Sequence, residues 1–587
     1  MCGIAGWFGK NAGCDAAALT AALRHRGPDG EGAWHDCQDR AALIHTRLAI
    51  LDPSDAGAQP MRCDAIRGRK AHSWIVLNGE IFNFRELRTE LESHGEIFKG
   101  RSDTEVLLRL LELYGKAALG RLAGMFAFAW YDCQSGRGLL ARDPFGIKPL
   151  YYTERNGGVA FASEVRALRP LMSEASISPS AVRDTLLWGS VPEPATLIEG
   201  IAKLPAGSYL EWDGATIKVE RWHDIRFGQS AVPRNPVVAA RAALLESVER
   251  HLVSDVPLGI FLSGGVDSTA VLALAREVLG AAAELRTFSI GFDDAAYDES
   301  RVARRTVDHF GARHTEWRMT PEEGQAEVAG YMAAMDQPSI DGFNTWCVSK
   351  MARREGMKVV LSGLGGDELF GGYGSFQRVP QFERLHRVLG PLRPAAAAAL
   401  DLAPAGSRWR RVTAFLRSPG TPLAAFHAQR GIFTEPEARE LARSLTGTDP
   451  GPVNWQAEDL PDDVSDRVSF LEMTRYMRNQ LLCDSDVFSM AHGLELRVPF
   501  VDARLFDSLA AIPSRIRLAK GKQLLLDSVP EIPPWVREQP KRGFRFPFEE
   551  WSRGKFGETL ELADAVSGIP LVTWYRRWAL AVVLHQR

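Results

Sequence analysis

The stretch FLSGGVDST, residues 261–269, stands between an apolar run typical of a strand and an amphipathic run typical of a helix. Its two glycines allow the backbone to approach a phosphate closely, and Ser263, Ser268 and Thr269 offer hydroxyl groups. The N-terminus of the following helix would direct backbone N–H donors at the same anion. The stretch lacks the lysine of the ordinary GxxxxGK[ST] loop. It predicts an anion-binding loop or, on the plainer interpretation, a tight turn without a ligand.

The segments around this loop alternate between helical and strand-like patterns. We expect helices at 236–252, 268–280 and 301–311, and strands within 258–265, 285–292 and 358–363. Strands that alternate with helices predict a doubly wound parallel sheet. From about residue 380 onward most segments have helical patterns.

A second glycine-rich loop follows the strand pattern in KVVLSGLGGDELFGGY, residues 358–373, and carries Asp367 and Glu368. The carboxyl ends of parallel strands meet at one edge of a sheet, so the strand ends at Ile290 and at 362–363 should lie beside the first loop. Asp267 and Asp367 would then face one Mg²⁺ from two loops. Taken alone, the second loop is equally well interpreted as a glycine turn with solvated acids.

The first part of the chain has short apolar runs separated by Gly, Pro and Asn. We expect strands at 72–83, 124–132, 137–143, 150–154 and 158–164, and helices at 85–95 and 103–115. Near Trp222 these short apolar runs give way to longer helical stretches that alternate with strand-like segments. We therefore place a first domain of sheets plus helices at 1–215, a linker at 216–236 and a second domain at 237–587.

Composition limits the classes of function. A chain of 587 residues is too long for one hydrophobic core, and its formal net charge of −3 gives no strong field to favour nucleic acid or an anionic membrane. The seven cysteines are scattered, odd in number and without a CxxC pair, which argues against a disulfide framework and a zinc site. The sequence contains no secretory signal pattern and no membrane-spanning run. We expect a cytoplasmic protein with no nucleic-acid or membrane partner, and a homodimer is one option.

The chain begins MCGIAGWFG, which puts Cys2 directly after the initiator methionine. Removal of that methionine would leave a thiol and a free α-amine on one residue. A cysteine at this position is more often inert, because reactivity needs a tuned thiolate.

Several motifs with a fixed order accompany this start. They are MCGIAG (1–6), RHRGPD (24–29), HTRLAILD (45–52), LNGEIFN (77–83), SDTEVLL (102–108), GMFAFAWYD (124–132), ARDPFGIKPLYY (141–152), SGGVDS (263–268), YDES (297–300), SGLGGDELFGGY (362–373) and MAHGLELRVPFVD (490–502). In these motifs the chain resembles the glutamine-dependent asparagine synthetase family over nearly its whole length. The resemblance implies two domains: an N-terminal αββα sandwich of the N-terminal-nucleophile hydrolase type, and a C-terminal doubly wound parallel sheet of the pyrophosphate-loop ATP-binding type with extra helices.

For the first domain the resemblance implies a glutaminase. The thiol of processed Cys2 would attack the side-chain amide of glutamine, with its own α-amine, whose pKa is ordinarily about 7.7 to 8.0, as the base. Asn78 and the amide of Gly79 would form the oxyanion hole. Arg47 would hold the α-carboxylate of glutamine and Asp103 its ammonium group, although each alone would be interpreted as a solvated surface charge. The other glutamine-binding residues would be Leu48, Ala49, Ile50, Leu51 and Glu80.

For the second domain the resemblance implies ATP-dependent adenylation of a carboxylate. Adenosine would contact Leu262, Ile290, Ser362 and Gly363, and pyrophosphate would contact Ser263, Gly264, Gly265, Val266, Asp267 and Ser268. Lys522, in LAKGKQLLLD (518–527), matches the lysine that neutralises phosphate charge in the transition state. Without that match it would be interpreted as a lysine on a helix surface.

The implied reaction releases ammonia from glutamine at one site and forms an acyl-AMP from ATP, with Mg²⁺, at the other. Ammonia would cross between the domains through an apolar tunnel and attack the acyl-AMP. L-aspartate is the expected acceptor. Two alternatives stay open: the same machinery acting on a sugar acid, a peptide or a cell-wall precursor, and a nucleotide-binding regulatory protein with dead sites, which the retained reactive residues disfavour.

Leu364, in SGLGGDE, departs from the family pattern, because asparagine synthetases of the best-known bacterial type carry a glutamate there. Leucine cannot accept the proton that ammonia loses after it attacks the acyl-AMP. Either Glu368 or solvent accepts that proton, or the pocket suits an acceptor other than free aspartate.

Overall fold

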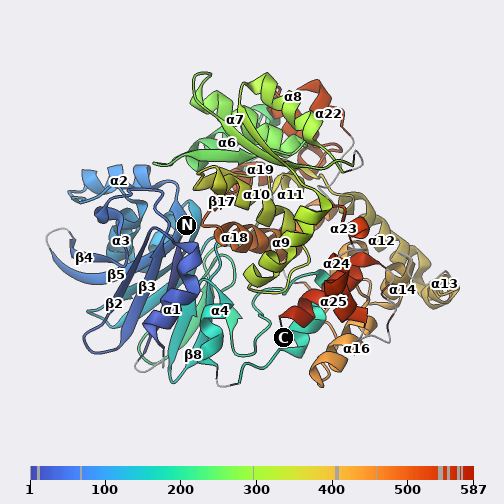
Figure 1. The fold of residues 1–587 in the computed structure, drawn as a ribbon, viewed down its shortest axis with the longest axis horizontal. Coiled ribbons are helices and arrows are strands. Elements are labelled where there is room, and N and C mark those ends of the chain that lie inside the picture. The colour runs from blue at the N-terminus through green and yellow to red at the C-terminus, as the bar shows by residue number, and fades with distance from the viewer. Residues whose placement is uncertain are drawn as a thin grey trace.

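The computed structural model describes residues 2–9, 14–66, 69–172, 174–294, 297–402, 409–457, 459–539, 546–551, 555–564, 569, 571 and 573–586. Met1, whose removal the sequence analysis assumes, lies outside these residues. Figure 1 shows an N-terminal part built on sheets, coloured blue to cyan, beside a C-terminal part that begins with a second α/β unit and ends in helices.

Two six-stranded antiparallel sheets form the centre of the N-terminal part. The first has, in spatial order, β10 (Ala202–Lys203), β8 (Tyr151–Arg155), β9 (Gly158–Ala162), β1 (Gly3–Phe8), β3 (Ala41–Arg47) and β2 (Gly30–His35). The second has β12 (Ile217–Arg221), β11 (Ser208–Trp212), β7 (Arg137–Arg142), β6 (Gly124–Asp132), β5 (Arg69–Ile81) and β4 (Met61–Ile66). The helices of this part are α1 (Ala16–Leu23), α2 (Phe84–Ser93), α3 (Asp103–Tyr114), α4 (Val165–Leu168) and α5 (Pro179–Trp188), with 3₁₀ turns at 24–26, 55–57, 115–121 and 169–171.

The two sheets pack face to face around an apolar core. Ile4 and Phe8 of β1 meet Val76 of β5 and Ala127 of β6 there, because alternate residues of each strand point inward. Helices α1 and α4 cover the outer face of the first sheet, and α2 and α3 cover that of the second. This arrangement is the predicted αββα sandwich.

The strand β12 lies inside the segment that the sequence analysis gave to the linker. It pairs with β11 over its whole length, from Ile217 opposite Trp212 to Arg221 opposite Ser208. Residues 222–235 then contain no helix or strand. We therefore propose that the first domain extends to Arg221, and that the linker is residues 222–235.

A five-stranded parallel sheet organises the second part, with the order β15 (Arg313–Arg318), β14 (Arg286–Gly291), β13 (Leu258–Phe261), β16 (Val359–Leu361) and β17 (Glu495–Arg497). The chain runs outward from β13 to β15 and then returns to the other side of β13. The switch point therefore lies between β13 and β16, where open α/β sheets bind ligands. The predicted doubly wound sheet is confirmed.

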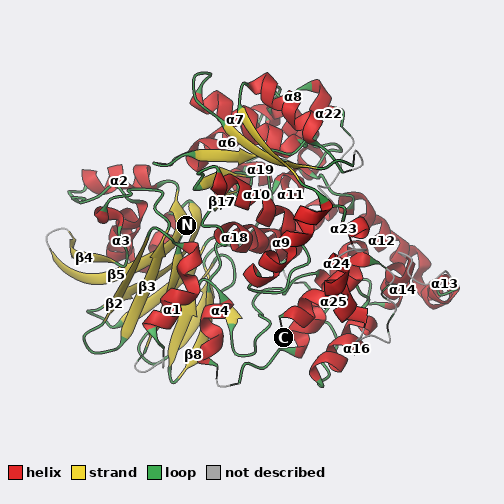
Figure 2. Ribbon diagram, viewed as in Figure 1, coloured by secondary structure: helices red, strands yellow, loops and turns green. Residues whose placement is uncertain are grey.

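Helices pack on both sides of this sheet, with α7 and α8 on one side and α10 and α18 on the other (Figure 2). The helices of this α/β unit are α6 (Pro236–His251), α7 (Val266–Leu279), α8 (Ser300–Phe310), α9 (Pro321–Ala334), α10 (Phe343–Arg354), α11 (Gly366–Phe370), α18 (Leu482–Met490) and α19 (Ala503–Ala510). The remaining helices are α12 (Ser375–Leu389), α13 (Arg393–Leu400), α14 (Trp409–Arg417), α15 (Pro422–Arg430), α16 (Glu435–Thr446), α17 (Val464–Leu471), a π-helix (Glu472–Leu481), α20 (Ser514–Arg517), α21 (Gln523–Ser528), α22 (Pro534–Arg537), α23 (Phe548–Trp551), α24 (Lys555–Asp564) and α25 (Trp574–His585), with a 3₁₀ turn at 390–392.

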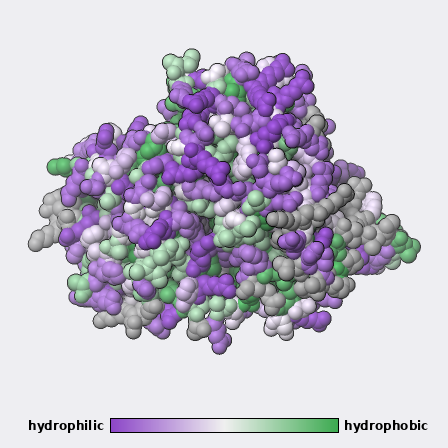
Figure 3. Space-filling view, in the orientation of Figure 1, coloured by the Kyte–Doolittle hydropathy of each residue, from purple (hydrophilic) through white to green (hydrophobic). Residues whose placement is uncertain are grey.

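The last helices return to the first part of the chain. Buried residues of α5 share one apolar cluster with α16 and α25, among them Leu186, Leu441 and Leu580. The face shown in Figure 3 is largely hydrophilic, with apolar residues interspersed. Within the described ranges, no helix combines the length and the apolar character that crossing a bilayer requires.

Candidate active sites

Cys2 lies at the start of β1, a central strand of the first sheet. Gly3 follows it because a Cβ at that position would lie only 2.5 Å from Oγ1 of Thr46, to which the Gly3 N–H donates a hydrogen bond of 3.1 Å. The Cys2 side chain is buried, and burial raises the pKa of its thiol. A neutral thiol of this kind needs a base before it can attack a carbonyl carbon.

Asn78 and Gly79, near the end of β5, lie beside Cys2. The backbone N–H of Cys2 donates to Oδ1 of Asn78 at 3.1 Å. The buried Nδ2 of Asn78 has no hydrogen-bond partner among the described residues. Gly79 has a φ of +132°, and a Cβ there would lie 2.0 Å from the carbonyl oxygen of Met125, so no other residue fits. An unpaired buried donor beside a thiol is suited to an oxygen that becomes negative during the reaction.

Arg47 and Asp103 line the same cavity from two other elements. The guanidinium of Arg47, at the end of β3, donates to the carbonyl oxygens of Ser54 at 3.0 Å and Asp52 at 2.5 Å, which fixes its position. Asp103 is the first residue of α3, and its Oδ2 accepts the backbone N–H of Ile81 at 2.8 Å. The complete lining is Cys2, Arg47, Leu48, Ile50, Leu51, Gly57, Gln59, Leu77, Gly79, Glu80, Ser102, Asp103 and Thr104.

Of the predicted glutaminase residues, only Ala49 and Asn78 do not line this cavity. Asn78 contacts Cys2 directly, as described above. Ala49 instead supports the loop, because its backbone N–H donates to Oδ2 of Asp29 at 2.8 Å, and that carboxylate also binds Nζ of Lys358 at 2.8 Å.

Two buried carboxyl groups make the cavity electrostatically unusual. Burial raises the pKa of Asp103 to about 6. The pKa of Glu80 is raised well above its usual range, first by burial and then by the nearby charges of Asp103 and Glu495. Nη2 of Arg497, in β17, lies 3.5 Å from Oε1 of Glu80, so a charge of the second domain reaches the wall of this cavity.

A larger cavity of about 320 Å³ lies at the carboxyl ends of β13, β14 and β16. Eight of the ten residues predicted to bind ATP line it: Leu262, Ser263, Gly264, Asp267, Ser268, Ile290, Ser362 and Gly363. The other two, Gly265 and Val266, mark the start of α7, with Gly265 as its N-cap, and are not among the lining residues.

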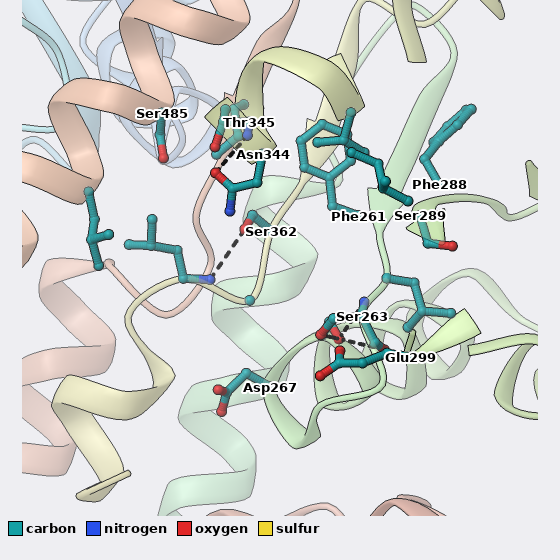
Figure 4. Close-up of a pocket in the computed structure, with 18 of the residues that line it drawn as sticks. Phe261, Ser263, Asp267, Phe288, Ser289, Glu299, Asn344, Thr345, Ser362 and Ser485 are labelled. Carbon is teal, nitrogen blue, oxygen red and sulfur yellow. Dashed lines mark hydrogen bonds between the residues drawn. The ribbon is translucent and has the colours of Figure 1, made fainter. Parts of the chain in front are cut away.

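Internal hydrogen bonds hold the first loop in a cradle (Figure 4). The hydroxyl oxygens of Ser263 and Ser268 lie 3.0 Å apart, and Ser268 Oγ also accepts the backbone N–H of Ser263 at 3.1 Å. The N–H of Gly264 donates to Oε2 of Glu299 at 3.1 Å. Two backbone N–H groups and two hydroxyl groups are thereby concentrated at the end of β13, in front of the N-terminus of α7.

Asp267 and Asp367, the two predicted metal ligands, face one cation from the first turns of α7 and α11, rather than from the loops before them. That cation is the ammonium group of Lys522, which lies 2.6 and 2.5 Å from the two carboxylate oxygens of Asp267 and also contacts Asp367. Burial acts to lower the pKa of Lys522, but the two carboxylates outweigh it and raise the pKa. Two carboxylates that converge in this way have the oxygen chemistry that Mg²⁺ prefers. Lys522 itself contacts the two lining carboxylates without being part of the lining.

Several polar residues that line the large cavity have no role predicted from the sequence. They are Ser289, Glu299, Ser300, Asp341, Asn344, Thr345, Tyr373, Asp484 and Ser485, whereas Leu364 and Glu368 were singled out and also line it. Glu299 belongs to the YDES motif, so its motif could have indicated a role. Asp341 and Asp484 stand in segments without a local pattern, and only the fold brings them together.

The two cavities approach each other across an apolar contact between the domains. Leu48 and Ile50 of the smaller cavity pack with Val359 of β16 and Met490 of α18. The next residues along β16 are Val360 and Leu361, and the strand then delivers Ser362 to the larger cavity. Buried ions also cross this interface, because Arg26 donates to the carbonyl oxygen of Cys2 at 3.2 Å and to Oδ2 of Asp486 at 2.7 Å.

Comparison with protein families gives two matches that divide the chain. Residues 1–223 match the glutamine amidotransferase domain, and residues 239–569 match asparagine synthase.

Similar curated proteins extend over the same range. The chain is 32% identical to asparagine synthetase [glutamine-hydrolyzing] 1 of Bacillus subtilis, over 95% of this chain and 89% of that protein. It is 33% identical to a putative asparagine synthetase [glutamine-hydrolyzing] of Mycobacterium tuberculosis, over 96% of this chain and 89% of that protein. It is 33% identical to asparagine synthetase B of Escherichia coli over 63% of each chain.

Proposed function

Because the chain belongs to the family of glutamine-hydrolysing asparagine synthetases, we propose that it hydrolyses glutamine at the Cys2 cavity and uses the ammonia to amidate a carboxylate activated by ATP at the larger cavity. The observation that carries the proposal is the pairing of two unlike constellations in one chain. The Cys2 thiol lies beside Asn78, whose Nδ2 is an unpaired donor among the described residues. The loop at 263–268 lies beside Lys522, whose ammonium group binds both Asp267 and Asp367. A cytoplasmic location and a homodimer stay predictions.

At the smaller cavity, the sulfur of processed Cys2 attacks the amide carbon of glutamine. Its proton passes to the α-amine of the same residue and then to the departing ammonia. Nδ2 of Asn78 and the N–H of Gly79 donate to the oxygen that becomes negative, a contribution of about 10² to 10³ for each donor. Water then hydrolyses the thioester to glutamate. Arg47 and an ionised Asp103 hold the α-carboxylate and α-ammonium of glutamine.

At the larger cavity, a carboxylate oxygen of the acceptor attacks the α-phosphorus of ATP and pyrophosphate leaves. The amides and hydroxyls of residues 263–268 receive the pyrophosphate, and Lys522 neutralises its developing charge. Asp267 and Asp367 would hold Mg²⁺, which supplies further neutralisation of phosphate charge when it is bound. Ammonia then attacks the acyl carbon and AMP leaves.

We infer that Glu368 accepts the proton that ammonia loses. Its side chain is buried in the cavity wall, Oε1 accepts the hydroxyl of Tyr373 at 3.0 Å, and the pKa is raised to about 8 by burial and by the charges of Asp367 and Glu472. A pKa near the working pH suits a general base, which contributes about 10² to 10⁴ in rate. Leu364, which lines the same cavity, has no proton to exchange.

L-aspartate is the acceptor that the names of the relatives suggest, and Leu364 is the observation that favours a different carboxylic acid. Incubation with glutamine, ATP, Mg²⁺ and a candidate acid tests the function directly. The expected products are glutamate, AMP, pyrophosphate and the amide of the acid. Formation of ADP in place of AMP would contradict the adenylation mechanism.

Asp367→Asn tests the assignment of the two half-reactions. The variant should lose at least 100-fold in acceptor-dependent pyrophosphate release, because one of two carboxylates that face the phosphates is neutralised. Glutamine hydrolysis should stay within about twofold of the parent protein, since Asp367 lies in the other domain. Pyrophosphate release at the parent rate would refute the role given to Asp367.

A further inference from the structure

The larger cavity has a side that the nucleotide does not need. Once residues 262–268, Ile290, Ser362 and Gly363 are reserved for ATP, the polar and apolar groups that remain include Asp341, Asn344, Leu364, Glu368, Leu481 and Asp484. Figure 4 shows Asn344, Thr345 and Ser485 on one side of the cavity, with Ser263, Asp267 and Glu299 on the other. The acceptor would therefore contact the wall that contains Asp341, Glu368 and Asp484, which we call the acidic wall.

Hydrogen bonds fix the carboxyl groups of the acidic wall while leaving them able to accept more. Oδ1 of Asp341 accepts the N–H of the next residue, Gly342, at 2.8 Å, and Oδ2 of Asp484 accepts the hydroxyl of Ser339 at 2.8 Å. Oε2 of Glu368, another residue of the lining, is buried and has no hydrogen-bond partner among the described residues. Of these three oxygens, only Oε2 of Glu368 lacks a donor among the described residues, while the carboxyl groups of Asp341 and Asp484 can each accept further hydrogen bonds.

Among the described residues, Lys203 lies close to Asp484 and donates to Sγ of Cys483 at 2.6 Å, whereas Lys522 and Arg430 are paired with carboxylates. Lys522 binds Asp267 and Asp367, as described above. Arg430 donates to Oε2 of Glu472 at 2.7 Å and lies between the rings of Tyr373 and Tyr476, 4.2 and 4.0 Å from their centres. Of the residues that line the cavity in the described part of the chain, none is a lysine, an arginine or a histidine.

Building on the proposed function, we propose that the acceptor is a carboxylic acid with a single carboxylate, whose other polar groups are hydrogen-bond donors, and that the acidic wall discriminates against L-aspartate. Hydroxyl or ammonium groups would satisfy the oxygens of Asp341, Glu368 and Asp484. The α-carboxylate of aspartate would instead place a charged acceptor beside carboxyl groups whose own ionisation burial already disfavours, and none of the described lining residues is a cation that could receive it. Specificity therefore comes from exclusion of the second carboxylate as well as from new hydrogen bonds.

Three acids test this proposal with matched chemistry. L-aspartate and its α-carboxamide share the reacting β-carboxylate and the ammonium group, and differ only in the second carboxylate. D-glucuronate offers hydroxyl donors in place of ammonium, so it distinguishes the two sources of donors. We expect kcat/KM for pyrophosphate release with MgATP to be at least tenfold higher for the carboxamide, for glucuronate or for both than for aspartate.

Asp341→Asn supplies a second measurement that does not depend on absolute rates. Removal of one negative charge should narrow the ratio of kcat/KM between the carboxamide and aspartate by at least threefold. Asp308→Asn, a control on the exposed surface of α8, should leave that ratio unchanged, because it changes the net charge by the same amount away from the cavity.

The outcomes separate the two proposals. Aspartate that works as well as or better than both other acids would overturn the acidic-wall proposal and leave the proposed function intact. An unchanged ratio in Asp341→Asn would overturn the role of Asp341 in discrimination. Absence of pyrophosphate release with all three acids, from a protein that still hydrolyses glutamine, would overturn adenylation as the proposed function and the acidic-wall proposal with it.

Discussion

Asn78 illustrates how one side chain can serve two groups at an active site. Its Oδ1 holds the nitrogen of Cys2 at 3.1 Å, and its buried Nδ2 has no partner among the described residues. We expect Asn78→Ala to lower kcat for glutamine hydrolysis about 10² to 10³-fold with a much smaller change in KM, because the donor acts mainly on the transition state. Steady-state assays of glutamate formation measure this. A large rise in KM with kcat unchanged would instead show that Asn78 acts mainly in binding glutamine before the reaction.

Asp103 gives the glutaminase site a pH dependence. Burial raises its pKa from 3.8 to about 6, so the ionised form that binds the ammonium of glutamine becomes dominant only above pH 6. We expect kcat/KM for glutamine to rise as the pH increases through about 6. The same shift acts oppositely on stability: the folded state holds the proton more tightly than the unfolded state, so Asp103 favours folding below pH 3.8 and this contribution is lost as the pH rises through 6.

The control for this pH dependence is Asp103→Asn, which should have a lower kcat/KM and no inflection near pH 6. A profile for the parent protein that is flat between pH 5 and 7, or an inflection retained in the variant, would show that another group titrates there.

Residues within contiguous motifs could be predicted, and residues recruited by the fold could not. Cys2, Asn78 and Gly79 stand in short patterns whose chemistry is local, and the structure brings them together. Ala49 was expected in the cavity but supports it through its N–H. Asp341 and Asp484 come from a helix-preceding turn and from α18, far apart in sequence, and share a cavity only after the sheet has formed.

At the scale of elements, the contact between the second loop and α7 positions both phosphate-side carboxylates. A Cβ at Gly363 would lie 2.7 Å from the backbone of Asp267 and Ser268, a separation that real structures do not tolerate. We expect Gly363→Ala to push the second loop away from α7 and to reduce acceptor-dependent pyrophosphate release at least tenfold, while glutamine hydrolysis continues.

Gly374→Ala is the matched control for that change. Gly374 follows the same loop, has a φ of −65°, and has open space where its Cβ would lie. Acceptor-dependent pyrophosphate release by the Gly374→Ala variant should equal that of the parent protein. Equal activity of the Gly363 variant would mean that the loop is not held as closely as the structure shows.

The elements themselves followed largely from hydrophobic periodicity, and the exceptions have physical reasons. The edge strand β15 has the sequence RHTEWR, whose polar residues hide the pattern of a strand. The strand β17 is only three residues long, so its pairing with β16 depends on long-range contact. The strand β12, IKVER, falls in the predicted linker; it is a partly exposed edge strand, so its sequence has no clear apolar alternation.

At the scale of the whole molecule, the domain interface links the two chemistries. Leu48 and Ile50 of the glutamine cavity pack on Val359 of β16, which leads to the second cavity. Buried charges such as Arg26 and Asp486 also cross this interface. The predicted route for ammonia is therefore bordered by ionic as well as apolar groups, and the apolar tunnel stays a prediction.

The central claim is that one chain produces ammonia at Cys2 and consumes it at a separate site. Cys2→Ala tests it most directly, with amide formation measured in one preparation with either glutamine or an ammonium salt as the nitrogen source, and with an acid that supports pyrophosphate release. The account predicts that glutamine-driven synthesis and glutamate formation are lost, whereas ammonia-driven synthesis stays within about twofold of the parent protein. Glutamate formation at the parent rate in this variant, or equal loss of synthesis with both nitrogen sources, would contradict it.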